Sequence, residues 1–263
     1  MHAGAVMRGF NVDLSGRTVL VTGASSGIGH RFASAVAASG AKVVLGARRV
    51  ERLAALRATI EDEGGRALAV AMDVCDEASV VAAFDAAEHT FGSVDSVIAN
   101  AGVAYPGPAL DLSVADFDRT IATNLRGVFL TAREGARRMI AKDARARGHG
   151  RVVIVSSITA HQVTASMSAY SASKAAVTQM GRVLAKEWAA EGVNVNVIAP
   201  GYMVTELTED VWSQEGGKQL LASFPRKRIM SVEALCPLAL YLCSDASLEV
   251  TGSVFSVEDG QTL

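Results

Sequence analysis

The chain has 263 residues, of which 50% belong to the hydrophobic class and 20% are charged. A chain of this length can bury a large core, and it accommodates one large α/β domain or two small ones. Its 25 basic and 27 acidic residues nearly cancel, which gives no electrostatic reason to expect nucleic acid or an anionic membrane as a partner. Composition therefore favours a small, neutral or mildly polar ligand.

The first residues, 1–13, are interpreted as a poorly ordered extension, and no linker divides the remaining chain, so we expect a single domain over residues 14–263. The amino end lacks the basic start and apolar block of a secretory signal, and no apolar run reaches membrane-spanning length. Three cysteines without a CxxC pair suit a reducing compartment, so we expect a cytoplasmic protein. The scattered histidines indicate no metal site.

Short β-branched segments alternate with longer segments rich in alanine and leucine. The predicted strands lie in RTVLVT (17–22), AKVVLGA (41–47), RALAVAMDV (66–74), VDSVIAN (94–100), GRVVIVSS (150–157), VNVNVIAP (193–200) and GSVFSVE (252–258). The predicted helices cover residues 27–39, 49–63, 76–91, 113–142, 168–191 and 231–244, and the N-cap candidates are Asp76, Ser113 and Ser231. Strands this apolar are usually covered on both faces. The alternation therefore predicts an α/β fold with a doubly wound parallel sheet of about seven strands.

The first predicted strand is followed directly by TGASSGIGH, in which Gly23, Gly27 and Gly29 have the spacing G-xxx-G-x-G. Glycines there let the backbone turn tightly and approach a pyrophosphate, while the next helix directs its N-terminal amides at the phosphates. A glycine loop between a strand and a helix predicts a dinucleotide site. Its other expected cofactor contacts are Ser25, Ser26 and Ile28.

The end of the second predicted strand bears on which dinucleotide binds. An acidic side chain about 25 residues after the glycine loop would bind the ribose 2′-hydroxyl of NAD, whereas arginine would bind the 2′-phosphate of NADP. The segment LGARRVERL has no acidic residue before Glu51, so Arg48 and Arg49 predict NADP(H) in preference to NAD(H). Ser26 offers no further cation inside the glycine loop, and NAD remains the alternative.

Two more strand ends carry candidate cofactor contacts. After the third strand, MDV places Asp73 and Val74 where they can bond an adenine edge. After the fourth strand, ANAG brings backbone close to the cofactor at Asn100, Ala101 and Gly102.

The segment SAYSASKAAV places Tyr170 and Lys174 four positions apart on a predicted helix, where both side chains share one face. A free phenol has a pKa near 10, and a fixed ammonium nearby stabilises the phenolate and lowers that pKa. We therefore expect Lys174 to lower the pKa of Tyr170 and make the phenol a usable proton donor and acceptor. The small residues around the pair leave room for a cofactor along the helix.

The segments TGASSGIG, NAG, TNLRGVF, VVIVSSITA, YSASK and PGYMVT, in this order, resemble the short-chain dehydrogenase/reductase family in its compact form. The resemblance runs from residue 14 to the end of the chain. It implies a single Rossmann-type domain, usually a homotetramer with a homodimer as the alternative, that moves hydride between NAD(P) and an alcohol or carbonyl. The Tyr-xxx-Lys spacing departs from enoyl reductases, where these residues lie further apart.

The resemblance also implies a catalytic set of Asn124, Ser157, Tyr170 and Lys174. Ser157, at the carboxyl end of the fifth strand, would bond the substrate oxygen, with Ser156 as the rival position. Lys174 would bind the nicotinamide ribose, and Asn124 would hold a water that connects Lys174 to solvent. A hydrolase is disfavoured because no histidine falls at a triad position and no G-x-S-x-G elbow exists.

Residues 200–229 form a long stretch with weak periodicity, which we interpret as a flap over the ligand. Its start resembles the Pro-Gly stretch of the family, whose cofactor contacts would be Pro200, Gly201, Met203 and Thr205. Candidate substrate contacts after Ser157 are His161, Val163 and Met167, which do not define one substrate.

Together these features predict an NADP(H)-dependent oxidoreductase that interconverts a carbonyl compound and a secondary alcohol, with Tyr170 as acid and base. A small molecule is the expected substrate. The alternatives are an NAD-dependent dehydrogenase of a hydroxylated metabolite and a dinucleotide-sensing protein without turnover.

Overall fold

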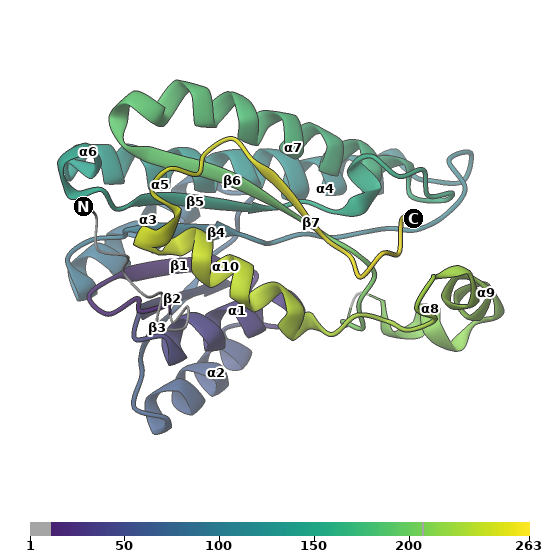
Figure 1. Ribbon diagram of the computed structural model, residues 1–263, viewed down its shortest axis with the longest axis horizontal. Helices are drawn as coiled ribbons and strands as arrows, with labels where there is room; N and C mark the ends of the chain where they lie inside the picture. Colours follow the sequence, from purple (N-terminus) through teal and green to yellow (C-terminus); the bar gives the residue numbers. More distant parts are fainter. Residues whose placement is uncertain (1–11, 207) are drawn as a thin grey trace, which may run out of the picture.

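A computed structural model describes residues 12–206 and 208–263. Seven strands form one sheet in the order β3-β2-β1-β4-β5-β6-β7, and every neighbouring pair is parallel (Figure 1). The strands are β1 (Thr18–Thr22), β2 (Lys42–Ala47), β3 (Arg66–Ala71), β4 (Ser96–Ala99), β5 (Gly150–Val155), β6 (Val193–Pro200) and β7 (Val254–Val257). The predicted fold class, a single parallel sheet of Rossmann type, is confirmed.

Helices connect the strands and cover both faces of the sheet. The α-helices are α1 (Gly27–Ala38), α2 (Val50–Asp62), α3 (Glu77–Phe91), α4 (Val114–Ile121), α5 (Val128–Ala141), α6 (Ala144–Arg147), α7 (Ser168–Trp188), α8 (Glu209–Ser213), α9 (Glu215–Ser223) and α10 (Cys236–Cys243). The shorter turns are a π-helix, η1 (Ala122–Gly127), and the 3-10 helices η2 (Ile158–Ala160), η3 (Ala189–Glu191), η4 (Val232–Leu235) and η5 (Asp245–Ser247). The three predicted N-caps each accept a backbone N–H, at Asp76, Ser113 and Ser231.

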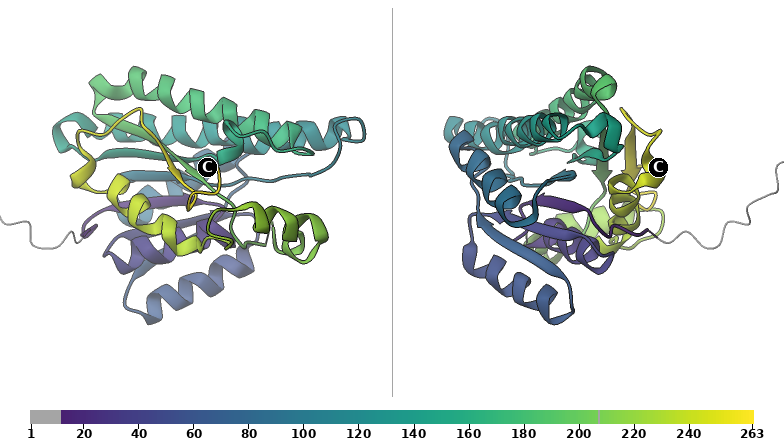
Figure 2. Two further views of the ribbon diagram at one scale, coloured as in Figure 1. Left: turned by 45° about the vertical axis from the view of Figure 1, so that its right-hand side comes forward. Right: turned by 90° about the vertical axis from the view of Figure 1, so that its left-hand side faces the viewer.

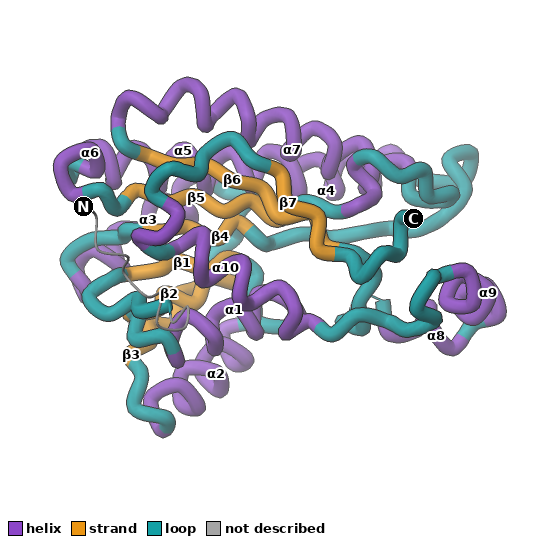
Figure 3. Tube along the Cα trace, viewed as in Figure 1, coloured by secondary structure: helices purple, strands orange, loops and turns teal. Residues whose placement is uncertain are grey.

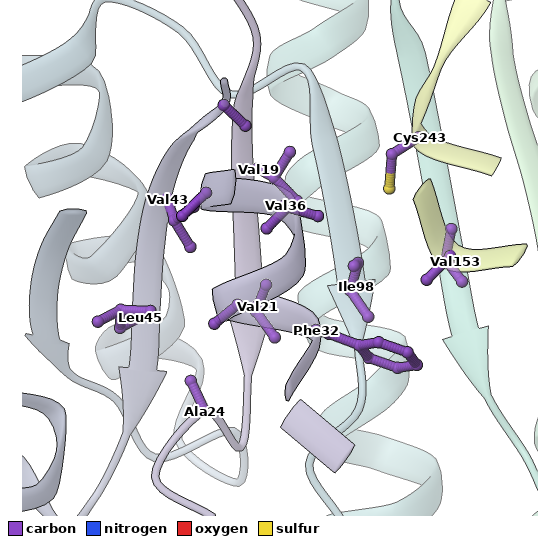
Figure 4. Close-up of a cluster of buried hydrophobic side chains, with 14 of the residues drawn as sticks. Val19, Val21, Ala24, Phe32, Val36, Val43, Leu45, Ile98, Val153 and Cys243 are labelled. Carbon is purple, nitrogen blue, oxygen red and sulfur yellow. The ribbon is translucent and has the colours of Figure 1, made fainter. Parts of the chain in front are cut away.

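Alternation along each strand divides the core into two layers. On β1, Val19 and Val21 pack into one cluster, while Leu20 packs into the other. The first cluster is completed by α1, α2 and α10, and Figure 4 shows Phe32 and Val36 of α1 and Cys243 of α10 beside it. Helices α3, α5 and α7 complete the second, and Figure 2 shows helices on both sides of the sheet. Because both faces are covered, the strands are nearly continuous runs of apolar residues.

The topology creates a crevice where the strand order reverses. β1 pairs with β2 on one side and with β4 on the other. The strands after β1 are added on one side of it as far as β3, and the chain then crosses to the other side to begin β4. In open α/β sheets, ligands bind outside the carboxyl ends of the strands at such a point. The glycine loop between β1 and α1 lies there.

Three segments differ from the sequence prediction. The helix expected over residues 113–142 is divided into α4 and α5 by the π-helix η1, and the helix expected at 231–244 begins as a 3-10 turn. The predicted flap contains α8 and α9, which Figure 3 shows set apart from the sheet. These two helices are short, and neither has a side-chain cap, so no regular sequence pattern marks them. The predicted extension at residues 1–13 lies almost entirely outside the described residues.

Candidate active site

A cavity of 720 Å³ opens at the carboxyl ends of the central strands. The glycine loop, the ends of β2 to β6, helix α7 and the segment after β6 all contribute to its lining. With the exception of Gly29, every residue that we predicted as a cofactor contact lines this cavity. Of the predicted catalytic set, Ser157, Tyr170 and Lys174 line it, and Asn124 lies behind it.

The glycine loop has the conformation that its sequence predicts. Gly23 and Gly27 have φ values of 70° and 55°, in the left-handed region that favours glycine. A Cβ on Gly29 would lie 2.4 Å from the carbonyl oxygen of Gly23 and 2.5 Å from Nδ2 of Asn100. Gly29 therefore acts by letting helix α1 approach the loop closely.

Hydrogen bonds join the loop after β1 to the loop after β4. Oγ1 of Thr22 accepts from the backbone N–H groups of Asn100 and Ala101, at 3.0 and 3.1 Å. Nδ2 of Asn100 donates to the carbonyl of Thr22 at 3.0 Å. These bonds fix the two rims of the crevice relative to each other.

Two adjacent arginines lie at the end of β2 in different environments. Nε of Arg49 donates to Oγ of Ser25 at 3.2 Å, and its Nη2 donates to Oγ of Ser26 at 2.7 Å, so this guanidinium lies over the glycine loop. Arg48 is exposed on the cavity rim and has no hydrogen bond or ion pair with any described residue. Glycines that admit a pyrophosphate, with an arginine beside them that has no partner among the described residues, fit a dinucleotide.

Tyr170, Ser157 and Lys174 meet at the inner end of the cavity. The Nζ atom of Lys174 lies 5.5 Å from the ring centroid of Tyr170 and donates to the carbonyl of Val155 at 2.9 Å. The hydroxyl group of Ser157 lies close enough to that of Tyr170 to favour the phenolate and lower its pKa. Tyr170 comes from α7 and Ser157 from the end of β5, so the sheet and one helix fix the spacing between them.

Burial is the largest cause of the pKa shifts of Tyr170 and Lys174. It raises the pKa of Tyr170, and the nearby hydroxyl of Ser157 acts in the opposite direction. It lowers the pKa of Lys174 to about 8. The expectation that the pKa of Tyr170 is lowered is therefore wrong for the free protein, because desolvation of the phenolate outweighs the favourable contacts. At neutral pH Tyr170 is a protonated acid.

The neighbouring serines have separate roles. Ser156 donates to the carbonyl of Lys174 at 2.9 Å and lies 2.6 Å from Oγ1 of Thr178, so its hydroxyl anchors helix α7. Oγ of Ser157 accepts from the N–H and the hydroxyl of Thr159, which orients it toward Tyr170. Geometry thus favours Ser157 over Ser156 as a partner for a substrate oxygen.

Asn124 lies inside the π-helix η1 and is completely buried. Its Oδ1 accepts from the N–H of Val103 at 2.8 Å, and its Nδ2 donates to the carbonyl of Val103 and to Oγ of Ser173. A Cβ on Gly102 would lie 3.4 Å from this Oδ1 and 3.6 Å from Nζ of Lys174. A single π turn often marks a functional site, and this one brings Asn124 to Gly102, which Lys174 also approaches.

The outer part of the cavity is built largely from residues that were not predicted as substrate contacts. Tyr202 stacks on Phe224 with centroids 5.6 Å apart and meets Trp212 edge-on at 6.0 Å. Met167 lines the cavity, but His161 and Val163 do not, and Val163 is 97% exposed. Further lining residues that sequence reasoning missed are Ala104, Pro106, Thr123, Thr159, Thr164, Ala165, Tyr202, Glu206, Thr208, Val211 and Leu220.

Two features of the described residues bear on other functions. Within the described ranges, no cluster of three or more His, Cys, Asp or Glu side chains is suited to a metal ion. The helices of residues 12–206 and 208–263 include none that is long and apolar enough to cross a bilayer.

Comparisons with known proteins agree with this geometry. The family described as short chain dehydrogenase matches residues 17–216. D-threitol dehydrogenase of Mycolicibacterium smegmatis is 37% identical over 97% of this chain and 96% of its own, and cis-4-hydroxycyclohexanecarboxylate dehydrogenase of Sinomonas cyclohexanicum is 39% identical over 94% and 96%. The structure of a gluconate 5-dehydrogenase from Burkholderia cenocepacia, in complex with NADP and tartrate, superimposes with a TM-score of 0.89 at 34% identity, covering 96% of this chain and 97% of that one. The chain therefore belongs to the short-chain dehydrogenase family, whose members are nicotinamide-dependent oxidoreductases of alcohol and carbonyl groups.

Proposed function

We propose that this protein is an NADP(H)-dependent reductase of a neutral carbonyl compound, which it converts reversibly into a secondary alcohol. The observation that carries this proposal is the meeting of Tyr170, Ser157 and Lys174 in one cavity with the glycine loop. Bound dinucleotide would supply the hydride for the carbonyl carbon. The remaining chemistry belongs to side chains of the chain itself.

The phenol and the serine hydroxyl would bind the carbonyl oxygen together. As the carbonyl is reduced, its π electrons would move to oxygen, and the proton of Tyr170 would pass to that oxygen to form the alcohol. Ser157 donates a hydrogen bond to the developing negative charge. Lys174 faces the resulting phenolate. The buried Asn124, which like Lys174 lies near Gly102, would hold a water through which a proton returns from solvent.

The outer cavity favours an uncharged substrate. Its walls are largely aromatic or aliphatic, with Tyr202, Trp212 and Leu220 on the flap side. The charged residues among the described lining are Arg48, Arg49, Asp73, Lys174 and Glu206, and all except the lysine belong to the cofactor end or the flap rim. A substrate carboxylate in the outer cavity would be desolvated without a cation, which is unfavourable.

The proposed function is tested by measuring NADPH oxidation with a carbonyl panel. We expect turnover of one or more neutral cyclic, aryl or aliphatic ketones, and slower turnover of keto acids of matched size. Absence of turnover across the neutral ketones, by protein that binds NADPH, would contradict the proposal. The panel includes the reverse reaction with polyols, because relatives named for threitol and gluconate favour oxidation of a hydroxylated metabolite as a second candidate.

Arg48→Ala tests the cofactor assignment. Charge-assisted bonds from a guanidinium to a phosphate contribute about 1.5–3 kcal/mol, so NADPH affinity should fall about 10- to 100-fold. NADH affinity should change little, because NADH has a hydroxyl at that position. The control is Arg57→Ala, which removes an exposed arginine of α2 that pairs with Glu61 outside the cavity. If Arg48→Ala lowered the affinities for NADPH and NADH equally, Arg48 would have no role in recognising the phosphate.

A further inference from the structure

Glu206 brings a carboxylate to the cofactor end of the cavity from a distant part of the chain. It follows Thr205 on the segment after β6 and lines the same cavity as Arg48 and Arg49. Its two carboxylate oxygens accept from Nη1 of Arg49 at 2.9 and 3.1 Å, and one of them accepts from Nη1 of Arg52 at 2.8 Å. The two arginines are separated from it by 157 and 154 residues.

Because of this carboxylate, Arg48 and Arg49 differ in how far their charges are already compensated. The charge of Arg49 is paired with Glu206, and its remaining donors are directed at Ser25 and Ser26. Arg48 has no such partner among the described residues. A ribose 2′-phosphate that entered this corner would find one free guanidinium and one whose charge is already compensated.

If NADP(H) bound here, its 2′-phosphate and the Glu206 carboxylate would be two anions that compete for Arg49 and Arg52. Their repulsion, or the loss of the existing ion pairs, would weaken binding of NADP(H). The neutral 2′-hydroxyl of NAD(H) meets no such repulsion and can donate to a carboxylate. In dehydrogenases that use NAD, that acceptor is an acidic residue after the second strand, and here the position between β2 and α2 holds arginines instead.

We infer that Glu206 is a cofactor-specificity residue that weakens the preference for NADP(H) over NAD(H) by competing with the ribose 2′-phosphate for Arg49 and Arg52. This inference rests on the proposed function, in which NADP(H) is the cofactor and its 2′-phosphate binds beside Arg48. Hydrogen bonds from Arg52, Arg49 and Ser26 lower the pKa of Glu206 to about 2. The carboxylate therefore stays charged at every pH used in enzyme assays, and the competition persists throughout.

The inference is tested by titrating Glu206→Gln and the wild type with NADPH and with NADH, following intrinsic fluorescence or heat. The substitution keeps the size of the side chain and removes its charge. We expect the dissociation constant for NADPH to fall about three- to tenfold and that for NADH to stay equal or rise. The matched control is Glu209→Gln, the same change at an exposed position of α8, which should move neither constant.

Two further results decide the inference. In an Arg49→Ala/Arg52→Ala background, Glu206→Gln should improve NADPH affinity by a smaller factor than in the wild type, because no ion pair then has to be broken and only the repulsion between the two anions is relieved. If Glu206→Gln changed both dissociation constants equally, or neither, in the wild-type background, the inference would be wrong and the proposed function would stand. If the wild type bound neither dinucleotide, the proposed function itself would fail, so the two failures are distinguishable.

Discussion

Tyr170→Phe is expected to reduce kcat for carbonyl reduction by about 10²–10⁴-fold, the range for losing a positioned general acid. In the proposed mechanism the phenol carries the proton for the substrate oxygen, and no other acidic side chain of the described lining lies beside Ser157. NADPH affinity should stay within about twofold, because the ring and helix α7 remain. Steady-state kinetics combined with NADPH titration separates these effects.

The pH profile gives a second measurement on the same residue. Burial raises the pKa of Tyr170, so the phenol stays protonated at and above neutral pH. Reduction by the wild type should therefore be constant through neutrality and decline at alkaline pH, while alcohol oxidation, which needs the phenolate, should rise with pH. The residual rate of Tyr170→Phe should lack this dependence. Tyr105→Phe, outside the cavity lining, serves as the control. Reduction by Tyr170→Phe at the wild-type rate would exclude the proposed mechanism.

Lys174→Met is expected to reduce kcat by about 10²–10³-fold while raising thermal stability near pH 7. The loss of rate follows from removing the cation 5.5 Å from the Tyr170 ring centroid. The gain in stability follows from burial: Lys174 is only 3% exposed, and desolvation lowers its pKa to about 8. Each kcal/mol gained should raise Tm by about 2–4 °C in a domain of this size.

The stability effect has a defined pH dependence. Between about pH 8 and its ordinary pKa of 10.5, Lys174 is more protonated in the unfolded chain than in the folded protein. The free energy of unfolding of the wild type therefore rises with pH across this window, and the penalty is fully present below it. The Tm advantage of Lys174→Met should accordingly shrink from pH 7 to pH 10.

Lys186→Met, an exposed position on the same helix, is the control for the loss of a lysine as such. It should leave kcat unchanged and show no comparable change of Tm with pH. A Lys174→Met protein that was less stable than the wild type at pH 7 would mean that the bond from Nζ to the Val155 carbonyl outweighs the desolvation of the ammonium.

Local sequence patterns were sufficient for the strands, for most of the long helices and for the conformation of the glycine loop. The seven strands follow β-branched runs, and Asp76, Ser113 and Ser231 cap the following helical segments as predicted. The glycine spacing requires left-handed backbone at Gly23 and Gly27, which the structure has. Each of these features depends on residues close together in the chain, where periodicity and steric limits act directly.

Other properties of the site could not be predicted from local sequence patterns. The spacing of Tyr170 and Lys174 predicts a shared face, yet the direction of the phenol pKa depends on how completely the surrounding elements exclude water. Of the predicted substrate contacts, Met167 lines the cavity but His161 and Val163 do not, whereas Tyr202 and Trp212 lie in its lining. Helices α8 and α9 lack capping side chains and have no distinctive pattern.

The sequence by itself determined the strands, the main helices, the glycine loop and the identity of the phenol and lysine pair, because these features arise from interactions within a few residues. Only the tertiary structure decided that Glu206 meets Arg49 across 157 residues, that Asn124 lies in a π turn against the Lys174 site, and that burial governs both pKa values. Such contacts arise when the whole sheet and its helices pack together, so their distances and their dielectric environment belong to the assembled chain and to no single segment.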